Sequence, residues 1–315
     1  MQEDIIQAID RKLIEKELTS NKFLRKTNNG NNEIYILSHI DSPHSMLEIG
    51  RLREISFRTA GGGTGKSTDI DEFDTGENPY KQLIVWDPIE KEIVGGYRFI
   101  LGNEVGYYAD GTPKLATSGL LNYSEKFIKD YLPVTIELGR SFVQPKYQPS
   151  RESRKGLFSL DNLWDGLGSL VVDYPHIKYF FGKVTMYSHF NPVARDMILY
   201  FMKTFFPDKE NLIAPKAPLT YKTDVSKFEN MFCGDTFELN HKILFQKVRE
   251  HGENIPPLVN SYMVISPSMK SFGTAWNEEF GGVEETGILI TIADIYENKT
   301  ERHVNTYKKE KQTEK

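Results

Sequence analysis

Three short apolar segments in the first half of the chain constrain its fold more than any other feature. They span residues 82–86 (QLIVW), 93–101 (IVGGYRFIL) and 134–143 (VTIELGRSFV), and they are rich in the β-branched and aromatic residues that favour strands. The turn-rich sequence DPIEKE joins the first two, which predicts a β-hairpin. A hairpin followed by a further strand favours a mostly antiparallel sheet as the centre of the fold.

The other periodic segments predict helices and strands around this sheet. Apolar residues at helical spacing indicate helices, and short apolar runs indicate strands. The predicted helices span residues 5–18, 45–58, 160–174, 193–206 and 238–251. The further predicted strands span 33–37, 177–186 and 286–295, with a long loop over 102–122 and an extended segment over 258–265.

The chain divides into four predicted parts. Residues 1–40 form an N-terminal helix and lead-in, and residues 41–210 hold most of the strands and form the core. Residues 211–297 form a C-terminal extension that caps the core. Residues 298–315 carry almost no apolar side chains, so we predict a flexible tail.

Composition excludes several classes of protein. The 39 basic and 44 acidic residues give the 315-residue chain a net charge of −5, so overall charge does not attract it to nucleic acid or anionic lipid. A single cysteine, Cys233, excludes a disulfide framework and a cysteine-rich metal site, and we expect no metal. The N-terminal segment lacks the apolar core of a signal peptide. We therefore expect a cytoplasmic protein, one that can also make peripheral contact with the inner membrane surface.

Residues 60–67 (AGGGTGKS) match the looser phosphate-loop pattern. That motif binds phosphate only where the loop leaves a buried strand and opens a helix. Here a predicted helix precedes it, and a stretch with five acidic residues, 69–77, follows it. We interpret the segment as a flexible turn without nucleotide hydrolysis.

The acidic stretch itself has two interpretations. Asp69, Asp71 and Asp74 form the pattern D-x-D-x-F-D with Phe73, just before a predicted strand. Phe73 can anchor such a segment to the core while the carboxylates face a pocket and bind an amine or a cation. A solvated charged face is the alternative.

Two charged residues, Glu137 and Arg140, lie within the apolar segment 134–143. Buried charge is costly unless it is paired or functional, and strict alternation would place these two on opposite faces. A bulge at Gly139 would return both to one side and free a backbone N–H that can polarise a carbonyl group. Arg98, in the neighbouring predicted strand, could pair with these carboxylates. A structural salt bridge is the alternative.

A basic loop follows this strand. Residues 146–155 contain four basic residues and one acidic residue. Their position next to the charged strand suits a phosphate group or an acidic carrier protein. A solvated loop is the alternative.

Five short motifs occur in a fixed order: RLREISFR, DxDxFD, LIV, GGYRF and ELGRSFV. In this order they resemble the GNAT-related N-acyltransferases that make lyso-aminolipids such as lyso-ornithine or lyso-glycine lipid, often labelled hemolysin-like. They are more distantly similar to the acyl-homoserine lactone synthases. The resemblance runs from Met46 to Pro207, and more loosely through PPLVNSYMVISPSMKSFGTAW and TGILITIADI.

The resemblance implies an α+β fold of the GNAT-like type: a mixed, mostly antiparallel twisted sheet flanked by helices, with a C-terminal extension. It also implies that the strands beginning near Val134 and Ile177 splay apart to admit the pantetheine arm of an acyl donor. The C-terminal extension would cover a tunnel for the acyl chain.

The resemblance further implies roles for individual residues. The implied substrate-binding residues are Arg53, Phe57, Asp69, Asp71, Asp74 and Arg98. The first two would line the acceptor side, the aspartates would orient the amino substrate, and the second arginine would brace them. The implied catalytic residues are Glu137 and Arg140. The implied residues for the carrier and its phosphopantetheine are Ser141, Lys146, Arg151, Arg154 and Lys155.

Two departures from the family pattern bear on the donor and the mechanism. Phe142 stands where many relatives have cysteine, so we expect direct transfer without an enzyme thioester. The pyrophosphate loop of acetyl-CoA enzymes, Q/R-x-x-G-x-G/A, is missing after the strand 134–143. This absence favours acyl carrier protein over CoA as the cosubstrate, with no tightly bound cofactor.

We therefore expect an enzyme of aminolipid biosynthesis. It would move a long 3-hydroxy fatty acyl group from acyl carrier protein to the α-amine of an amino acid, with Glu137 as the base. Two alternatives stay open at this point: a synthase of acyl-homoserine lactone signals, and a non-catalytic hemolysin-like lipid-binding protein.

Overall fold

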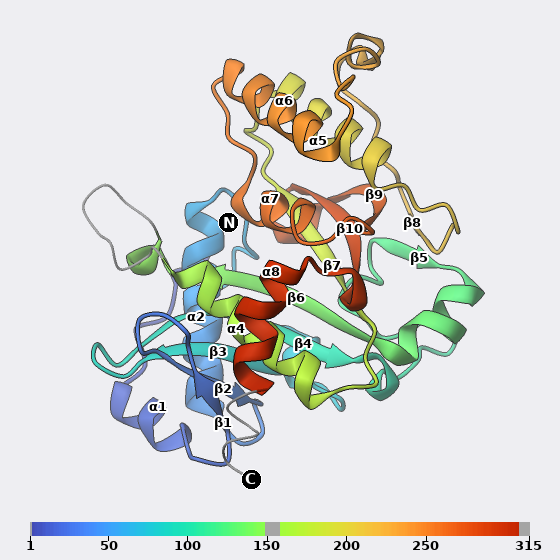
Figure 1. Cartoon of the computed structure of the whole chain (residues 1–315). Coiled ribbons are helices and arrows are strands. Elements are labelled where there is room, and N and C mark those ends of the chain that lie inside the picture. Colours follow the sequence, from blue (N-terminus) through green and yellow to red (C-terminus); the bar gives the residue numbers. More distant parts are fainter. Residues whose placement is uncertain (1, 149–157, 309–315) are drawn as a thin grey trace.

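A single mixed sheet organises the molecule (Figure 1). The computed structural model describes residues 2–148 and 158–308. Within them the sheet has eight strands in the order β1-β2-β3-β4-β6-β7-β10-β9. Their bounds are β1 Phe23–Lys26, β2 Glu33–Leu37, β3 Lys81–Asp87, β4 Glu92–Leu101, β6 Thr135–Val143, β7 Tyr179–Met186, β9 Lys270–Asn277 and β10 Val283–Thr291. A small second sheet pairs β5 (Leu121–Tyr123) with β8 (Ile213–Pro215).

Helices cover both faces of the sheet. Their bounds are α1 Arg11–Glu17, α2 Pro43–Thr59, α3 Glu72–Thr75, α4 Ser159–Asp173, α5 Pro192–Phe205, α6 Phe237–Glu250, α7 Pro257–Met263 and α8 Glu297–Thr300. On one face α1 and α2 pack in a cluster with Ile84 and Phe142. On the other face α4, α5 and α7 pack in a larger cluster with Leu83 and Leu138. Two separate hydrophobic layers therefore enclose the sheet, as the α+β prediction required.

The predicted hairpin is confirmed, since β3 and β4 pair in antiparallel register from Lys81 with Phe99 to Asp87 with Glu92. Among the described strands, β6 and β7 form the one parallel pair. They pair only over four residue pairs, from Thr135 with Tyr179 to Leu138 with Gly182. Beyond that point the two strands are no longer hydrogen-bonded to each other, which confirms the predicted splay and opens a gap within the sheet.

A bulge interrupts β6 next to this gap. Arg98 of β4 pairs with Gly139, whereas Gly96 pairs with Phe142, so β6 has one residue more than β4 between these pairs. Arg140 takes a φ of 49°, the left-handed conformation that non-glycine residues seldom adopt. The predicted bulge is therefore present, and the residue that bears its unusual backbone conformation is Arg140.

The C-terminal extension belongs to the same sheet. β10 pairs with β7 along its whole length, from Glu284 with Met186 to Thr291 with Tyr179, and β9 forms the edge beyond it. The segment predicted to be extended, 258–265, is instead mostly the helix α7. Pro257 at the first helical turn and apolar residues at helical spacing explain why a helix forms there.

The predicted flexible tail is wrong for its first part. Residues 297–308 are helical and lie beside α4 (Figure 1). His303 Nδ1 lies 2.7 Å from Asp165 Oδ1, and Val304 and Tyr307 are buried. Further contacts join Arg302 to Asp161 and Tyr307 to Asp173, so the segment docks on a helix that is already part of the core. Residues 309–315 lie outside the described part.

The N-terminal segment also differs from its prediction. The helix α1 begins only at Arg11, because residues 2–10 run along the glycine-rich loop instead. Glu3 N donates to Gly65 O at 2.8 Å, and Ile6 N donates to Ser67 O at 3.2 Å. In the described residues no helix is long and apolar enough to cross a membrane.

Candidate functional site

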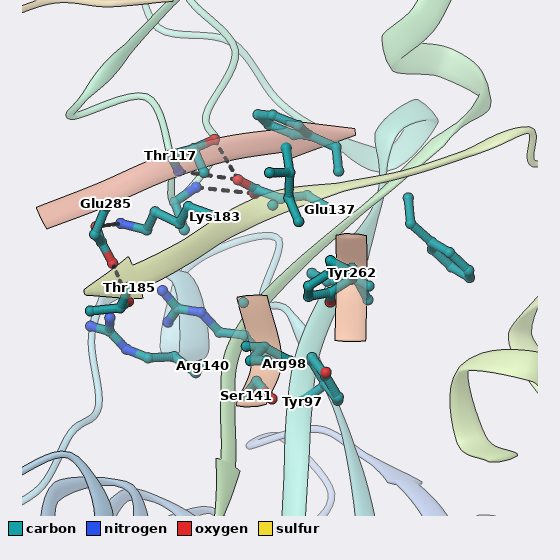
Figure 2. Close-up of a pocket in the computed structure, with 18 of the residues that line it drawn as sticks. Tyr97, Arg98, Thr117, Glu137, Arg140, Ser141, Lys183, Thr185, Tyr262 and Glu285 are labelled. Carbon is teal, nitrogen blue, oxygen red and sulfur yellow. Dashed lines mark hydrogen bonds and ion pairs between the residues drawn. The ribbon is translucent and has the colours of Figure 1, made fainter. Parts of the chain in front are cut away.

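The gap between β6 and β7 opens into a narrow cavity that is continuous with solvent (Figure 2). β6 contributes Glu137 through Ser141, and β7 contributes Phe180 through Lys183 together with Thr185. Residues from both faces of the sheet line the cavity, which shows that it extends through the sheet from one face to the other. The strand divergence thus creates a passage between two layers that a continuous sheet would keep apart.

Polar and charged side chains line the face of the cavity toward α2. They are Arg98, Thr117, Glu137, Arg140, Lys183, Thr185 and Glu285, with the rings of Phe57 and Phe280 beside them. Apolar side chains and three hydroxyl groups line the face toward α4 and α7. They are Leu138, Phe180, Leu258, Ile288 and Ile290, with the hydroxyls of Tyr97, Ser141 and Tyr262.

Glu137 lines the cavity and is 2% exposed. One carboxylate oxygen accepts from the Tyr80 hydroxyl and from Ala116 N at 3.2 Å. The other accepts from Thr117 N at 3.1 Å and from Thr117 Oγ1 at 2.5 Å. Burial raises the pKa of Glu137, although these hydrogen bonds and Arg98 oppose the shift. The carboxylate is thus fixed in orientation and has a pKa moved toward the range of a general base.

Arg98 crosses from β4 to the acidic segment. Its Nη1 donates to Asp71 Oδ1 at 2.6 Å and to Asp74 Oδ2 at 3.1 Å. Asp74 also accepts from Arg53 Nη1 at 3.1 Å and from Gln82 Nε2 at 3.0 Å. Burial acts to raise the pKa of Asp74, but the two arginines more than offset it and hold that pKa well below its usual range. Asp74 is therefore ionised at neutral pH and anchors both arginines.

Arg140 is held in a similar way. Its Nε lies 2.9 Å from one oxygen of Asp69, which is fully buried, and its Nη2 lies 3.5 Å from Asp71. The guanidinium also lies 4.2 Å from the centre of the Phe280 ring. Burial raises the pKa of Asp69, with Arg140 opposing the shift. The bulge therefore directs a cation into the cavity and a buried carboxylate fixes it from behind.

A second buried ion pair lies on the C-terminal side of the cavity. Lys183 Nζ lies 2.5 Å from Glu285 Oε2, which also accepts from Asn277 Nδ2 at 2.8 Å. Thr185 Oγ1 donates to the other oxygen of Glu285 at 3.3 Å. Burial acts to raise the pKa of Glu285, yet Lys183 outweighs it and the net pKa is lowered. Figure 2 shows Arg98 and Arg140 extending toward the side of the cavity where this pair lies.

The predicted site residues outside the basic loop fall into two groups in the structure. The predicted residues that line the cavity are Phe57, Arg98, Glu137, Arg140 and Ser141. The predicted residues that do not line it are Arg53, Asp69, Asp71 and Asp74. The three aspartates bind arginine side chains behind the cavity wall, and Arg53 is one of the arginines that they bind. Direct contact of the aspartates with the substrate therefore has no support from the geometry, and we assign them the indirect task of holding the arginines.

The predicted basic loop is only partly described. Lys146 Nζ lies 3.1 Å from Glu92 and 3.8 Å from Glu90, so two carboxylates of the β3–β4 hairpin pair with this half-exposed side chain. The positions Arg151, Arg154 and Lys155 lie outside the described residues, and their carrier-binding role stays a prediction.

Several cavity residues were missed from the sequence. Lys183 carries the same signal as Glu137, a charge inside an apolar strand, and could have been found. Glu285 precedes the predicted strand 286–295, and only the pairing of β10 with β7 brings it to the cavity. Thr117 gave no signal, and neither did Tyr80, which lies behind the cavity wall, because both contact the carboxylate of Glu137 on a distant strand.

The phosphate-loop match has no phosphate-binding geometry. The helix α2 precedes residues 60–67, and the next helix, α3, begins only at Glu72. The loop amides of Thr64 and Gly65 donate to Glu54 at 3.1 and 2.8 Å. A carboxylate already occupies the donors that a phosphate would need.

Comparisons with known proteins agree with this geometry. Residues 52–155 match the acetyltransferase (GNAT) domain family. The glycine N(alpha)-acyltransferase of Phocaeicola vulgatus is 56% identical over 308 residues, which cover 98% of this chain and 94% of that enzyme. The glycine N(alpha)-acyltransferase of Bacteroides thetaiotaomicron is 56% identical over 305 residues, covering 97% and 90%.

A solved structure of the CoA-dependent acyl-homoserine lactone synthase BjaI, with MTA, aligns over 88% of this chain and 90% of that one. The identity is 12% and the TM-score is 0.36. The long, highly identical alignments to the two acyltransferases, with the GNAT domain match, show that this chain is an N-acyltransferase and belongs to the GNAT family that includes them.

Proposed function

We propose that the protein transfers a long 3-hydroxy fatty acyl group from a thioester donor to the α-amine of glycine, as a step of aminolipid biosynthesis. One observation carries the proposal: the cavity between β6 and β7 has a charged face toward α2 and an apolar face toward α7. An amino acid suits the first face and an acyl chain the second. The names of the two relatives support glycine as the acceptor.

The donor enters where the strands diverge. A pantetheine arm is thin enough to lie between β6 and β7, and its thioester then reaches the level of Glu137 and the bulge. We propose acyl carrier protein as the donor, with the basic loop after β6 as its contact and peripheral contact with a membrane that receives the product. CoA presents the same arm, so the assay below compares both donors.

The reaction needs one base and one oxyanion site. Glu137 takes a proton from the ammonium group, directly or through one water, and the free amine attacks the thioester carbonyl. Backbone N–H groups of the bulge at Arg140 and Ser141 stabilise the tetrahedral oxyanion. The carbon–sulfur bond then breaks, the proton that the nitrogen gives up as it becomes an amide passes to the sulfur, and the amide and thiol products leave while Glu137 releases its proton to solvent. No covalent enzyme intermediate is required, because proximity of the two bound substrates supplies much of the rate.

The experiment supplies purified protein with glycine and either 3-hydroxyacyl-carrier protein or 3-hydroxyacyl-CoA, and detects N-acylglycine by mass spectrometry. N-acylglycine supports the proposal, and the faster donor identifies the cosubstrate. Formation of an acyl-homoserine lactone from S-adenosylmethionine, without N-acyl amino acid, would contradict it. Membership in an N-acyltransferase family removes the reason to consider a non-catalytic lipid-binding protein.

A further inference from the structure

The mechanism above leaves one charged pair in the cavity without a task. Lys183 and Glu285 both line the cavity, and their side chains are 15% and 3% exposed. A buried ion pair adds little net stability, because the loss of hydration offsets the attraction between the charges. Such a pair inside a ligand cavity is therefore better explained by binding than by folding.

Glu285 and Lys183 differ in how much of their hydrogen-bonding capacity is used. Glu285 binds Lys183, Asn277 and Thr185, which engage both of its carboxylate oxygens. An ammonium group has three N–H donors, and in the described part of the chain Glu285 is the ion-pair partner of Lys183. Lys183 thus keeps donors for a ligand, whereas Glu285 is committed to holding it.

The position of Lys183 relative to Glu137 fits a small amino acid. Phe181 pairs in register with Glu137, and Lys183 follows two residues later on the same face of β7. Two residues of a strand span about 7 Å. A small α-amino acid that is hydrogen-bonded at both ends covers a comparable distance. Its amine can then point to Glu137 while its carboxylate points to Lys183.

We propose that Lys183 binds the carboxylate of the amino-acid acceptor, and that Glu285 is a positioning residue that fixes the Lys183 ammonium in the cavity. This inference rests on the proposed function, because it names how the acceptor of that reaction is recognised. Arg98 and Arg140 are less suited to the task, since each of them pairs with two aspartates, whereas Glu285 is the one ion-pair partner of Lys183 among the described residues. Lys183 thereby makes the enzyme selective for amines that carry a carboxylate.

The test compares glycine with glycinamide, which has the same amine and no carboxylate. We expect Lys183→Met to raise the KM for glycine about tenfold or more, the loss of one charge-assisted hydrogen bond. The KM for glycinamide and the KM for the acyl donor should stay unchanged. The ratio of kcat/KM for glycine to kcat/KM for glycinamide should therefore fall. The two amines differ in intrinsic reactivity, but this difference is the same for the wild-type and variant enzymes and drops out when their ratios are compared. Glu285→Gln should lower the ratio less.

Two variants complete the design. Lys222 Nζ lies 2.8 Å from Glu284, the neighbour of Glu285, in an ion pair that does not line the cavity. Lys222→Met is the matched control and should leave the ratio unchanged. Lys183→Arg keeps the charge and should retain most of the preference, so it gives an answer even where Lys183→Met fails to fold.

The inference is overturned if folded Lys183→Met keeps the wild-type ratio, or if Lys183→Arg lowers the ratio as far as Lys183→Met does. The proposed function fails in a different way, namely if the wild-type enzyme forms no N-acyl amino acid at all. The two failures are therefore separable in one set of assays.

Discussion

Glu137 shows how one residue can meet two opposing requirements. Its four hydrogen bonds stabilise the carboxylate and hold the turn at 116–117 against β6, while burial raises its pKa. A carboxylate in water would be oriented less well and would be a weaker base. The surroundings of Glu137 therefore give it both a fixed position and an increased affinity for a proton.

Replacement of this residue tests the proposed base. We expect Glu137→Gln to lower kcat by about two to four orders of magnitude, the usual contribution of a general base. In the wild-type enzyme kcat should rise with pH through a pKa above the ordinary carboxyl value, because the active form is the carboxylate. Steady-state assays between pH 5 and pH 9 measure both effects.

Thr117→Val serves as the companion variant. It removes a hydrogen bond that favours the charged form of Glu137, so the pKa rises further and the rise in kcat should move to higher pH. Full turnover by Glu137→Gln would show that another group removes the proton.

Replacement of Asp74 is expected to change the stability of the protein rather than its catalysis. Its carboxylate is fully buried between Arg53 and Arg98, so Asp74→Asn leaves two buried cations undercompensated. We expect a loss of about 3–5 kcal/mol in the free energy of unfolding. Urea unfolding at pH 7 measures it. Glu72→Gln, an exposed neighbour on the same helix, is the control and should have little effect.

The acid dependence of stability follows from the same residue. The pKa of Asp74 is lower in the folded than in the unfolded protein, so its contribution is fully present above the unfolded pKa near 4 and is lost as pH falls through the folded value. The wild-type protein should therefore lose more stability than Asp74→Asn below about pH 4. Equal losses in both proteins would contradict this assignment.

At the scale of elements, the sequence predicted best where local pattern and final environment agree. The strands rich in β-branched residues and the hairpin follow from local composition, and the bulge follows from charge at Glu137 and Arg140. The helix α7 was missed because Val259, Tyr262 and Val264 favour strands locally, and packing decides otherwise. The helical C-terminus was missed because its composition suits solvent, while its docking partner α4 lies far away in the sequence.

The candidate site was predictable to a similar extent. Charges inside apolar strands identified Arg98, Glu137 and Arg140, and all three line the cavity. Which carboxylates face the cavity and which lie behind it depends on the packing of α2 and α3 against the sheet. The place of Glu285 depends on a pairing between strands about a hundred residues apart in sequence. No local pattern contains such information.

One close contact between elements gives a direct test of the docked C-terminus. A Cβ atom at Gly168 of α4 would lie 2.3 Å from His303 O, so this glycine allows the C-terminal helix to approach. We expect Gly168→Ala to lower stability by about 1–3 kcal/mol, as for overpacking elsewhere. Thermal unfolding measures it. Gly119→Ala, whose Cβ would meet nothing within 4 Å, is the control. A Gly168→Ala protein as stable as the wild type would argue against this docking.

For the whole molecule, the C-terminal extension determines what the cavity can hold. Leu258 and Tyr262 of α7 and Ile288 and Ile290 of β10 form much of its apolar face. The acyl group of the proposed reaction would lie against these residues, so the extension sets the chain length. A GNAT core without this extension would leave that face open.

Filling this face should therefore shorten the preferred acyl chain. We expect Leu258→Trp to shift the preference to donors shorter by several carbons, while the KM for glycine stays the same. Competition between donors of different length, with mass spectrometry of the products, measures the shift. Leu239→Trp, at an exposed position on α6, is the matched control. An unchanged length profile for Leu258→Trp would place the acyl chain elsewhere.

The divergence of β6 and β7 has a further consequence for how the sheet presents its backbone. Unpaired strand edges normally lie at the perimeter of a sheet, where they invite pairing with other protein chains. Here the pairing ends at Leu138 and Gly182, so two such edges face each other inside the molecule. A polypeptide strand is too bulky to enter, whereas the pantetheine arm of the proposed donor is slender, carries amide groups of its own and would fit there. The sheet thus keeps a vacant place in its hydrogen-bond ladder that a substrate, and no neighbouring protein, can fill.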